Sequence, residues 1–128
     1  MTNDTPAIRN KNLVLYVLAQ FAEGDLAALR AALHEDFREH SPGNPSGRDA
    51  FVEFVAGSPV AKARIDVKRV ITDDEYAVVH YHMIPEDDPR GVAVAVVDVW
   101  RLVDGKITEH WDVLQPVPDP DLIPHGMF

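Results

Sequence analysis

Apolar residues in the first half of the chain recur every three or four positions, the spacing of one face of an amphipathic helix. The first series follows Thr5-Pro6, a pair typical of a capped helix start, and ends at Gly24. A shorter helix is predicted after Asp25, and a third over 48–57. The apolar positions of the three series are Val14, Val17, Leu18 and Phe21, then Leu26, Leu29 and Leu33, and finally Phe51, Phe54 and Val55.

The second half of the chain alternates apolar and polar residues, which is the pattern of strands. In the first strand the phase slips at Lys68-Arg69, which predicts a β-bulge. Asp104-Gly105 is the strongest hairpin signal in the chain. The predicted strands span about 63–71, 76–84, 91–103 and 106–115; a short extended segment covers 37–40, and the predicted loops are SPGNPSG (41–47) and the hairpin loop PEDDPRG (85–91).

Helices followed by a run of antiparallel strands predict an α+β fold. We expect a cone of three N-terminal helices packed on one face of a strongly curved, mostly antiparallel sheet. The length of 128 residues predicts one domain (1–128), with the proline-rich 117–128 as an extended tail. A bent sheet wrapped over helices leaves a conical cavity, a place where small molecules usually bind.

Composition narrows the function classes. The net charge is −9 and the basic residues form no run, which disfavours nucleic-acid binding. The absence of cysteine excludes disulfides, thiolate nucleophiles and cysteine-ligated zinc. No stretch approaches the roughly 20 apolar residues of a membrane span, and the N-terminus does not resemble a signal peptide. We therefore expect a soluble, cytoplasmic protein that needs no membrane.

Asp98 is the most informative residue, because it interrupts the most apolar stretch, GVAVAVVDVWRL. An ionised carboxylate in a dry place costs several kcal/mol unless it is paired. Either a raised pKa keeps Asp98 neutral, or a histidine or arginine compensates its charge. Both arrangements are common in enzyme pockets.

Histidines supply candidate acid/base partners. His80 and His82 share one face of their predicted strand, and His110 and Asp112 share one face of theirs. We treat these four as candidate pocket-lining residues, together with Trp100, which shares a face with Asp98 in a regular strand. The opposing interpretation is that His80 and His82 lie on a polar convex surface or at a dimer contact.

Three strings carry a family resemblance: EHSPGNPSGRDAFVEF (39–54), AVVHYH (77–82) and VVDVWRLVDGKITEHWDVLQPVP (96–118). With the order of the elements, they resemble the SnoaL-like and ketosteroid-isomerase-like group of the nuclear transport factor-like (cystatin-like cone) superfamily. They are most similar to SnoaL-like proteins described as aldol-condensation or polyketide-cyclase relatives. The resemblance covers the chain from the first helix to Gln115.

The resemblance implies roles for two catalytic candidates. Asp98 matches an aspartic acid of ketosteroid isomerases that, kept protonated, donates a hydrogen bond to an enolate oxygen. His40 matches the position of the isomerase's general base. The isomerase-like register, counted from Gly105, turns His110 and Asp112 inward, whereas a bulge is expected to reverse them. Two departures argue against steroid isomerisation or the standard cyclase reaction: Tyr16 is misplaced by one residue for the oxyanion tyrosine, and Gln115 stands where the cyclases often carry an acid.

These observations predict a cofactor-independent acid/base enzyme of the isomerase, lyase or cyclase type that acts on a small apolar carbonyl compound. One alternative is a non-catalytic module for binding small ligands or for dimerisation. A less favoured one is a metal site built from His80, His82 and His110 with Asp98 or Asp112, although no third ligand has a diagnostic spacing. The resemblance also implies a homodimer formed by the outer faces of the sheets.

Overall fold

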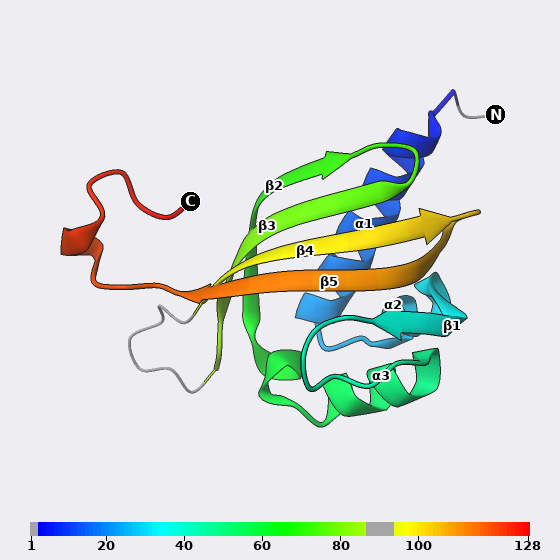
Figure 1. Cartoon of the computed structure of the whole chain (residues 1–128), viewed down its shortest axis with the longest axis horizontal. Coiled ribbons are helices and arrows are strands. Elements are labelled where there is room, and N and C mark those ends of the chain that lie inside the picture. The colour runs from blue at the N-terminus through cyan, green and yellow to red at the C-terminus, as the bar shows by residue number, and fades with distance from the viewer. Residues whose placement is uncertain (1–2, 87–93) are drawn as a thin grey trace.

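The computed structural model describes residues 3–86 and 94–128. Three α-helices precede most of the sheet in this part of the chain, and the sheet curves around them (Figure 1). The elements are α1 (Pro6–Ala22), α2 (Ala27–Ala32), β1 (Leu33–Glu39), α3 (Arg48–Ala56), β2 (Arg64–Thr72), β3 (Tyr76–Ile84), β4 (Val94–Val103) and β5 (Lys106–Pro116), with short 3₁₀ turns η1 (Pro59–Lys62) and η2 (Pro120–Leu122).

The sheet has the strand order β1-β5-β4-β3-β2. β1 pairs with β5 in parallel, and every other pair is antiparallel. The α+β prediction of helices on a curved, mostly antiparallel sheet is therefore confirmed. The register of β2 against β3 shifts between Val67 and Arg69, where the sequence predicts a bulge.

Local chemistry explains where the first helix begins and what it is attached to. The Thr5 side chain accepts a hydrogen bond from the Ile8 N–H at 3.2 Å, and Pro6 follows in the first turn. Farther along α1, the buried Asn10 donates to the carbonyl oxygens of Asp73 and Asp74 at 3.1 and 3.2 Å. These bonds fix α1 to the β2–β3 turn. None of the helices in the described residues combines the length and apolar character that crossing a membrane requires.

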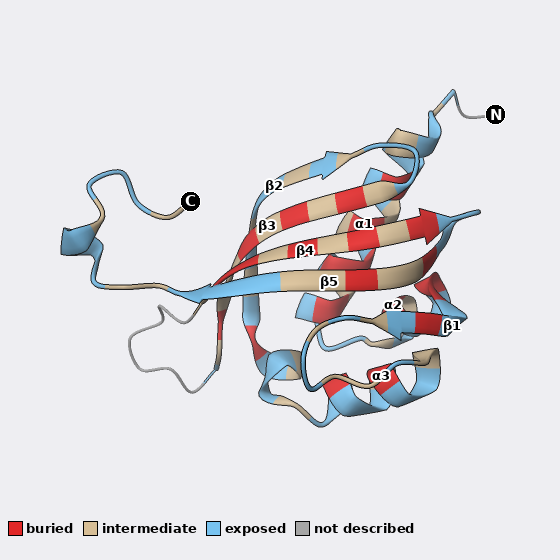
Figure 2. Ribbon diagram, in the orientation of Figure 1, coloured by how far each residue is buried: buried red, intermediate tan, exposed pale blue. Residues whose placement is uncertain are grey.

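The core lies between the helices and the concave face of the sheet (Figure 2). Phe37 and Leu33 of β1 and Ile107 of β5 are each only 1% exposed. Burial of one such side chain stabilises the fold by about 1.5–3 kcal/mol. Leu33 differs from the prediction: it begins β1 instead of continuing the stripe of α2, because the chain becomes extended directly after Ala32.

The β4–β5 turn follows its sequence signal. Asp104 and Gly105 have φ values of 51° and 77°, and a two-residue hairpin turn of this kind requires positive φ at both positions. Two residues farther on, however, the β4–β5 register shifts between Arg101 and Leu102, because Thr108 is an extra residue on β5. The Thr108 hydroxyl donates to the Arg101 carbonyl oxygen at 3.3 Å.

The tail after β5 departs from the expected fully extended form. It contains the turn η2, where the Asp119 side chain accepts from the Asp121 N–H, and then curls back beside the sheet (Figure 1). Its last residue, Phe128, stacks on His82. Most of the predicted hairpin loop over 85–91 and the first residues of the predicted third strand lie outside the described residues.

Candidate active site

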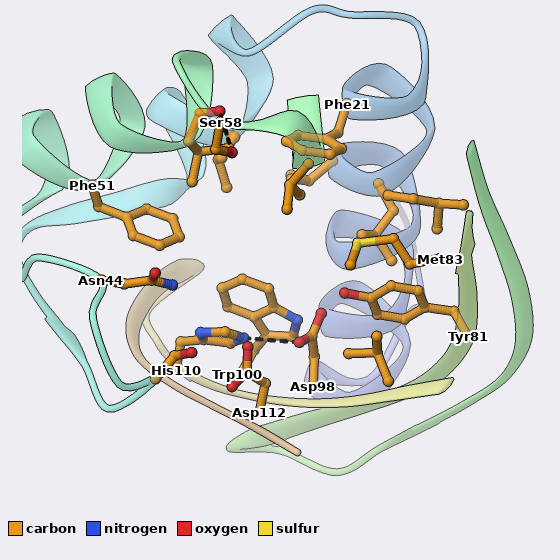
Figure 3. Close-up of a pocket in the computed structure, with 18 of the residues that line it drawn as sticks. Phe21, Asn44, Phe51, Ser58, Tyr81, Met83, Asp98, Trp100, His110 and Asp112 are labelled. Atoms are coloured by element: carbon orange, nitrogen blue, oxygen red, sulfur yellow. Dashed lines mark hydrogen bonds and ion pairs between the residues drawn. The ribbon is translucent and has the colours of Figure 1, made fainter. Parts of the chain in front are cut away.

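A cavity of about 360 Å³ lies between α1, α3 and the concave face of the sheet. Its walls are mainly aliphatic and aromatic. Asp98, His110 and Asp112 gather at one end beside the indole of Trp100, whereas Ser58 lies at the opposite side (Figure 3). The apolar and aromatic lining residues are Val17, Leu18, Phe21, Leu29, Phe51, Phe54, Val55, Val60, Ile65, Tyr81, Met83, Val96, Trp100 and Leu114; the polar ones are Ser41, Asn44, Ser58, Asp98, His110 and Asp112. An apolar cavity with a few convergent polar groups is the usual form of a small-molecule site.

The polar end is built by two neighbouring strands. Asp98 and Trp100 on β4 stand directly opposite Asp112 and His110 on β5 in the antiparallel register. Side chains directly opposite each other project from the same face of a sheet, so all four reach the cavity. The structure thus places Asp98, Trp100, His110 and Asp112 where the sequence expects them, in contact with one cavity.

His110 is held between two carboxylates. Its Nε2 lies 3.0 Å from Asp98 Oδ1, and its Nδ1 lies 2.8 Å from Glu39 Oε1. The three side chains are between 0% and 5% exposed. Trp100 stacks on the imidazole with ring centroids 3.9 Å apart. Of the two ways to accommodate Asp98, the structure shows compensation by a histidine.

The surroundings of His110 favour its charged form. Burial lowers its pKa, but the hydrogen bonds and charges of Asp98 and Glu39 outweigh burial and raise the pKa to about 9. Burial also raises the pKa of Glu39, but bonds from His110, from the Ser41 N–H and from Asn44 outweigh it, so this pKa lies below its ordinary value. Near neutral pH the group is therefore a carboxylate–imidazolium–carboxylate chain.

Asp112 is the second acid of the polar end, and it has fewer partners than Asp98. Burial raises its pKa; Ser41 and His110 act in the opposite direction, whereas the charges of Asp98 and Glu39 add to the increase. Its Oδ1 is buried without a hydrogen-bond partner among the described residues, as is the indole nitrogen of Trp100. Such atoms are uncommon in native proteins and point to a partner that a ligand or water supplies.

Tyr81 contributes a neutral hydroxyl beside Asp98. Burial and the charge of Asp98 raise its pKa well above the ordinary value. The hydroxyl therefore stays protonated and can hydrogen bond to Asp98 over the whole neutral range.

The structure corrects the placement of His40. This residue follows the last residue of β1, and its ring stacks face to face on Trp111, with centroids 4.7 Å apart. Its Nε2 lies 2.6 Å from Glu109 Oε2, and it does not line the cavity. Trp111 and Glu109 alternate with the cavity-lining residues of β5, so His40 lies on the far side of the sheet.

His80 and His82 also lie outside the cavity. On β3, Tyr81 and Met83 face the cavity, so the alternate positions face the outer side of the sheet. There His82 stacks on Phe128 at 4.7 Å between centroids, His80 lies 5.4 Å from the same ring, and Arg69 contacts His80. The polar convex surface that the sequence left open as the alternative is the arrangement found.

Glu39 is the site residue that the sequence analysis missed. Its position carried a signal, because it stands two residues after the buried Phe37 in an extended segment and therefore shares its inward face. His40 takes the opposite face for the same reason. Glu39, which directly precedes the expected base His40, is thus the residue whose side chain reaches the polar end of the cavity.

A divalent metal would find a poor set of ligands here. Ligand atoms of Asp98, His110 and Asp112 lie within 4.8 Å of one another. Both nitrogens of His110, however, are bonded to carboxylates, and the pKa of about 9 keeps the ring protonated, whereas a metal requires a neutral imidazole. The metal site that the sequence analysis considered, with His80 and His82 as ligands, is not formed, because these two histidines lie on the opposite face of the sheet from His110.

Comparison with known proteins agrees with this geometry. The model of the SnoaL-like domain matches residues 14–110, which is most of the chain. The protein belongs to the SnoaL-like family. No curated protein matches it.

Solved structures of similar shape come from several bacteria. A proposed ketosteroid isomerase from Kribbella flavida DSM 17836 is 19% identical with a TM-score of 0.76, covering 97% of this chain and 93% of that one. A proposed SnoaL-like polyketide cyclase from Jannaschia sp. CCS1 is 18% identical with a TM-score of 0.73, covering 90% and 91%. An NTF2-like protein of unknown function from Burkholderia xenovorans LB400 is 14% identical with a TM-score of 0.77, covering 94% and 96%. At these identities the likeness shows the fold alone.

Proposed function

We propose that this SnoaL-like protein is a cofactor-independent acid/base enzyme that enolises a small, largely apolar carbonyl compound, as an isomerase, lyase or cyclase does. The observation that carries the proposal is the buried chain of Glu39, His110 and Asp98 at the polar end of an apolar cavity. A proton donor and a proton acceptor with separated pKa values, held in one largely apolar pocket, are what such a reaction requires.

In the proposed reaction Asp112 is the proton acceptor. Its carboxylate takes the proton from the carbon next to the carbonyl group, and the electron pair of the broken C–H bond moves onto the carbonyl oxygen. The raised pKa of Asp112 makes it a stronger base than an ordinary aspartate. Asp112 thereby takes the role that the sequence analysis gave to His40.

Asp98 and His110 serve the oxygen of the same substrate. As negative charge develops on the enolate oxygen, His110 Nε2 passes its proton to Asp98 Oδ1 across 3.0 Å. The neutral carboxyl group of Asp98 then turns this O–H away from the imidazole and donates a hydrogen bond to the enolate oxygen. Glu39 accepts a hydrogen bond from the Nδ1–H of His110, which holds this proton on the ring and orients the imidazole, as the acid of a carboxylate–histidine pair does. Each of these contributions is typically about 10²–10³ in rate.

Deuterium exchange tests the proposal without knowledge of the natural substrate. A panel of small cyclic and aryl ketones is incubated with the protein in heavy water, and wash-in at the α-carbon is followed by NMR. We expect catalysed exchange for at least one ketone, about 100-fold slower in Asp98→Asn and Asp112→Asn. His40→Gln is the matched control, since it changes a polar residue outside the cavity and leaves exchange unchanged.

Two results would overturn the proposal: exchange that persists at the wild-type rate in both aspartate variants, or ketones that bind without any catalysed exchange. The second result favours the alternative of a small-ligand-binding module, which the mainly apolar walls of the cavity also suit.

A further inference from the structure

The charges around the cavity are unbalanced. Asp98, Asp112 and His110 line it, and Glu39 lies directly behind His110. No lysine or arginine is among the described residues that line it. When ionised, three carboxylates therefore face a single imidazolium.

The one positive charge is already used. His110 directs one ring nitrogen to Asp98 and the other to Glu39, so it has no N–H left for Asp112. Asp112 keeps Oδ1 buried and without a partner among the described residues. Asp112 as a whole is half-buried, but a carboxylate oxygen buried without a partner is unfavourable until a positive or proton-donating group meets it.

The walls beside the acids suit a cation as well. Trp100 lines the cavity next to Asp98, and Tyr81, Phe21 and Phe51 line it from other sides (Figure 3). Aromatic faces attract organic cations, most strongly where water is excluded. A carboxylate or phosphate on a ligand would instead meet like charges, and the one cation among the described lining residues, His110, is already engaged by Asp98 and Glu39.

We infer that the cavity binds its ligand through a protonated amine placed against Asp112, on an otherwise apolar skeleton. The amine supplies the missing partner of Oδ1, and Oδ2 remains as the proton acceptor of the proposed reaction. The aromatic and aliphatic walls cover the skeleton. The volume of about 360 Å³ lies near the lower end of small-molecule pockets, which limits the ligand to a small ring system or a short chain.

The inference deepens the proposed function by naming the substrate class, an amine-bearing apolar carbonyl compound. It rests on that function only for the carbonyl group. The carbonyl oxygen is also a hydrogen-bond acceptor, which the unpartnered indole N–H of Trp100 lacks. Binding of the amine is independent of catalysis and is measured separately.

Isothermal titration calorimetry at pH 7 tests whether the cavity prefers an amine. The three probes have nearly equal shape: cyclohexylmethylamine, cyclohexylmethanol and cyclohexanecarboxylate. We expect the amine to bind at least about tenfold more tightly than the alcohol, and the carboxylate most weakly. In Asp112→Asn the amine loses at least about tenfold in affinity, while the alcohol changes by less than about threefold.

Glu109→Gln is the matched control. It removes an equal charge from the same strand, but on the face turned away from the cavity. We expect the affinity for the amine to change by less than about twofold in this variant. An equal loss in both variants would mean that the amine responds only to net charge, and the inference would be wrong.

The wild-type comparison needs no variant, so a poorly folding Asp112→Asn leaves the test intact. Carboxylate binding equal to or tighter than amine binding overturns the inference, and so does failure of all three probes to bind. A preference for the amine without α-carbon exchange of any ketone, amine-bearing ketones included, would support this inference and refute the acid/base proposal. Exchange without a preference for the amine would refute this inference and support the acid/base proposal.

Discussion

The buried imidazolium of His110 makes the stability of the fold depend on pH in a specific way. In the folded protein the pKa of His110 is about 9, against an ordinary value of 6.5. A group whose pKa is raised by folding stabilises the protein fully below its unfolded pKa, and this contribution disappears as the pH rises through its folded pKa. The stabilising contribution of His110 is therefore complete below about pH 6.5 and is lost by about pH 9 and above.

The size of the effect follows from the same two values. One pKa unit corresponds to about 1.4 kcal/mol, so a shift from 6.5 to about 9 corresponds to about 3 kcal/mol of unfolding free energy. This is a large fraction of the about 5–15 kcal/mol that stabilises a typical domain. Urea unfolding at pH 6.5, 7.5, 8.5 and 9.5 measures it, and below pH 9.5 most lysine and tyrosine side chains keep their ordinary protonation.

His110→Gln identifies the group responsible. The variant cannot titrate at this position, so its unfolding free energy is expected to change little between pH 6.5 and 9.5. It also leaves Glu39 and Asp98 without their shared cation, which costs about 3–5 kcal/mol. His40→Gln serves as the control, and we expect it to retain the wild-type dependence on pH.

NMR gives an independent measurement in the wild-type protein if His110→Gln does not fold. The ring protons of His110 should titrate near pH 9, well separated from an ordinary histidine. A midpoint near 6.5, or a wild-type stability that is flat from pH 6.5 to 9.5, would refute the assignment of a buried imidazolium.

Three further predictions concern other parts of the molecule. Phe37→Ala removes a ring that is 1% exposed, and we expect it to lower the unfolding free energy by about 3–5 kcal/mol in urea titrations. Glu39→Gln keeps an acceptor beside His110 but removes its charge, so the NMR titration of His110 should move below about pH 9; an unchanged midpoint would show that Glu39 does not hold the proton. We propose that two copies pair through the outer face of the sheet, where Val113 is 71% exposed; sedimentation equilibrium should find a dimer, and Val113→Asp should yield monomers. A wild-type monomer would contradict this pairing.

Hydrophobic patterning was sufficient for most of the fold, because helix and strand periods differ clearly in this chain. The bulge at Lys68-Arg69 and the turn at Asp104-Gly105 both leave a local signal, and both are found. Leu33 was placed in the wrong element, since its spacing from Leu29 fits a helix equally well. Periodicity cannot locate the end of a helix of only six residues.

The faces of the site strands were harder to assign, because both sides of this sheet carry apolar residues. On β3 the outward position between Val79 and Tyr81 holds His80, so the apolar residues do mark the inner face. On β5 the same reasoning fails. Trp111 and Val113 look like core residues but face outward, whereas His110 and Asp112 face the cavity.

The bulge at Thr108 is the physical reason for that failure, and it also creates the site. Next to the turn, Leu102 pairs with Ile107, and a regular hairpin would continue this register and set Asp98 opposite Trp111. The extra residue advances β5 by one position, so Asp98 instead faces Asp112 and lies beside His110. The sequence analysis expected a bulge to turn His110 away from the cavity, but the bulge is what turns it inward. Because a buried carboxylate needs a partner, the irregularity that supplies His110 is what allows Asp98 to remain in this apolar strand.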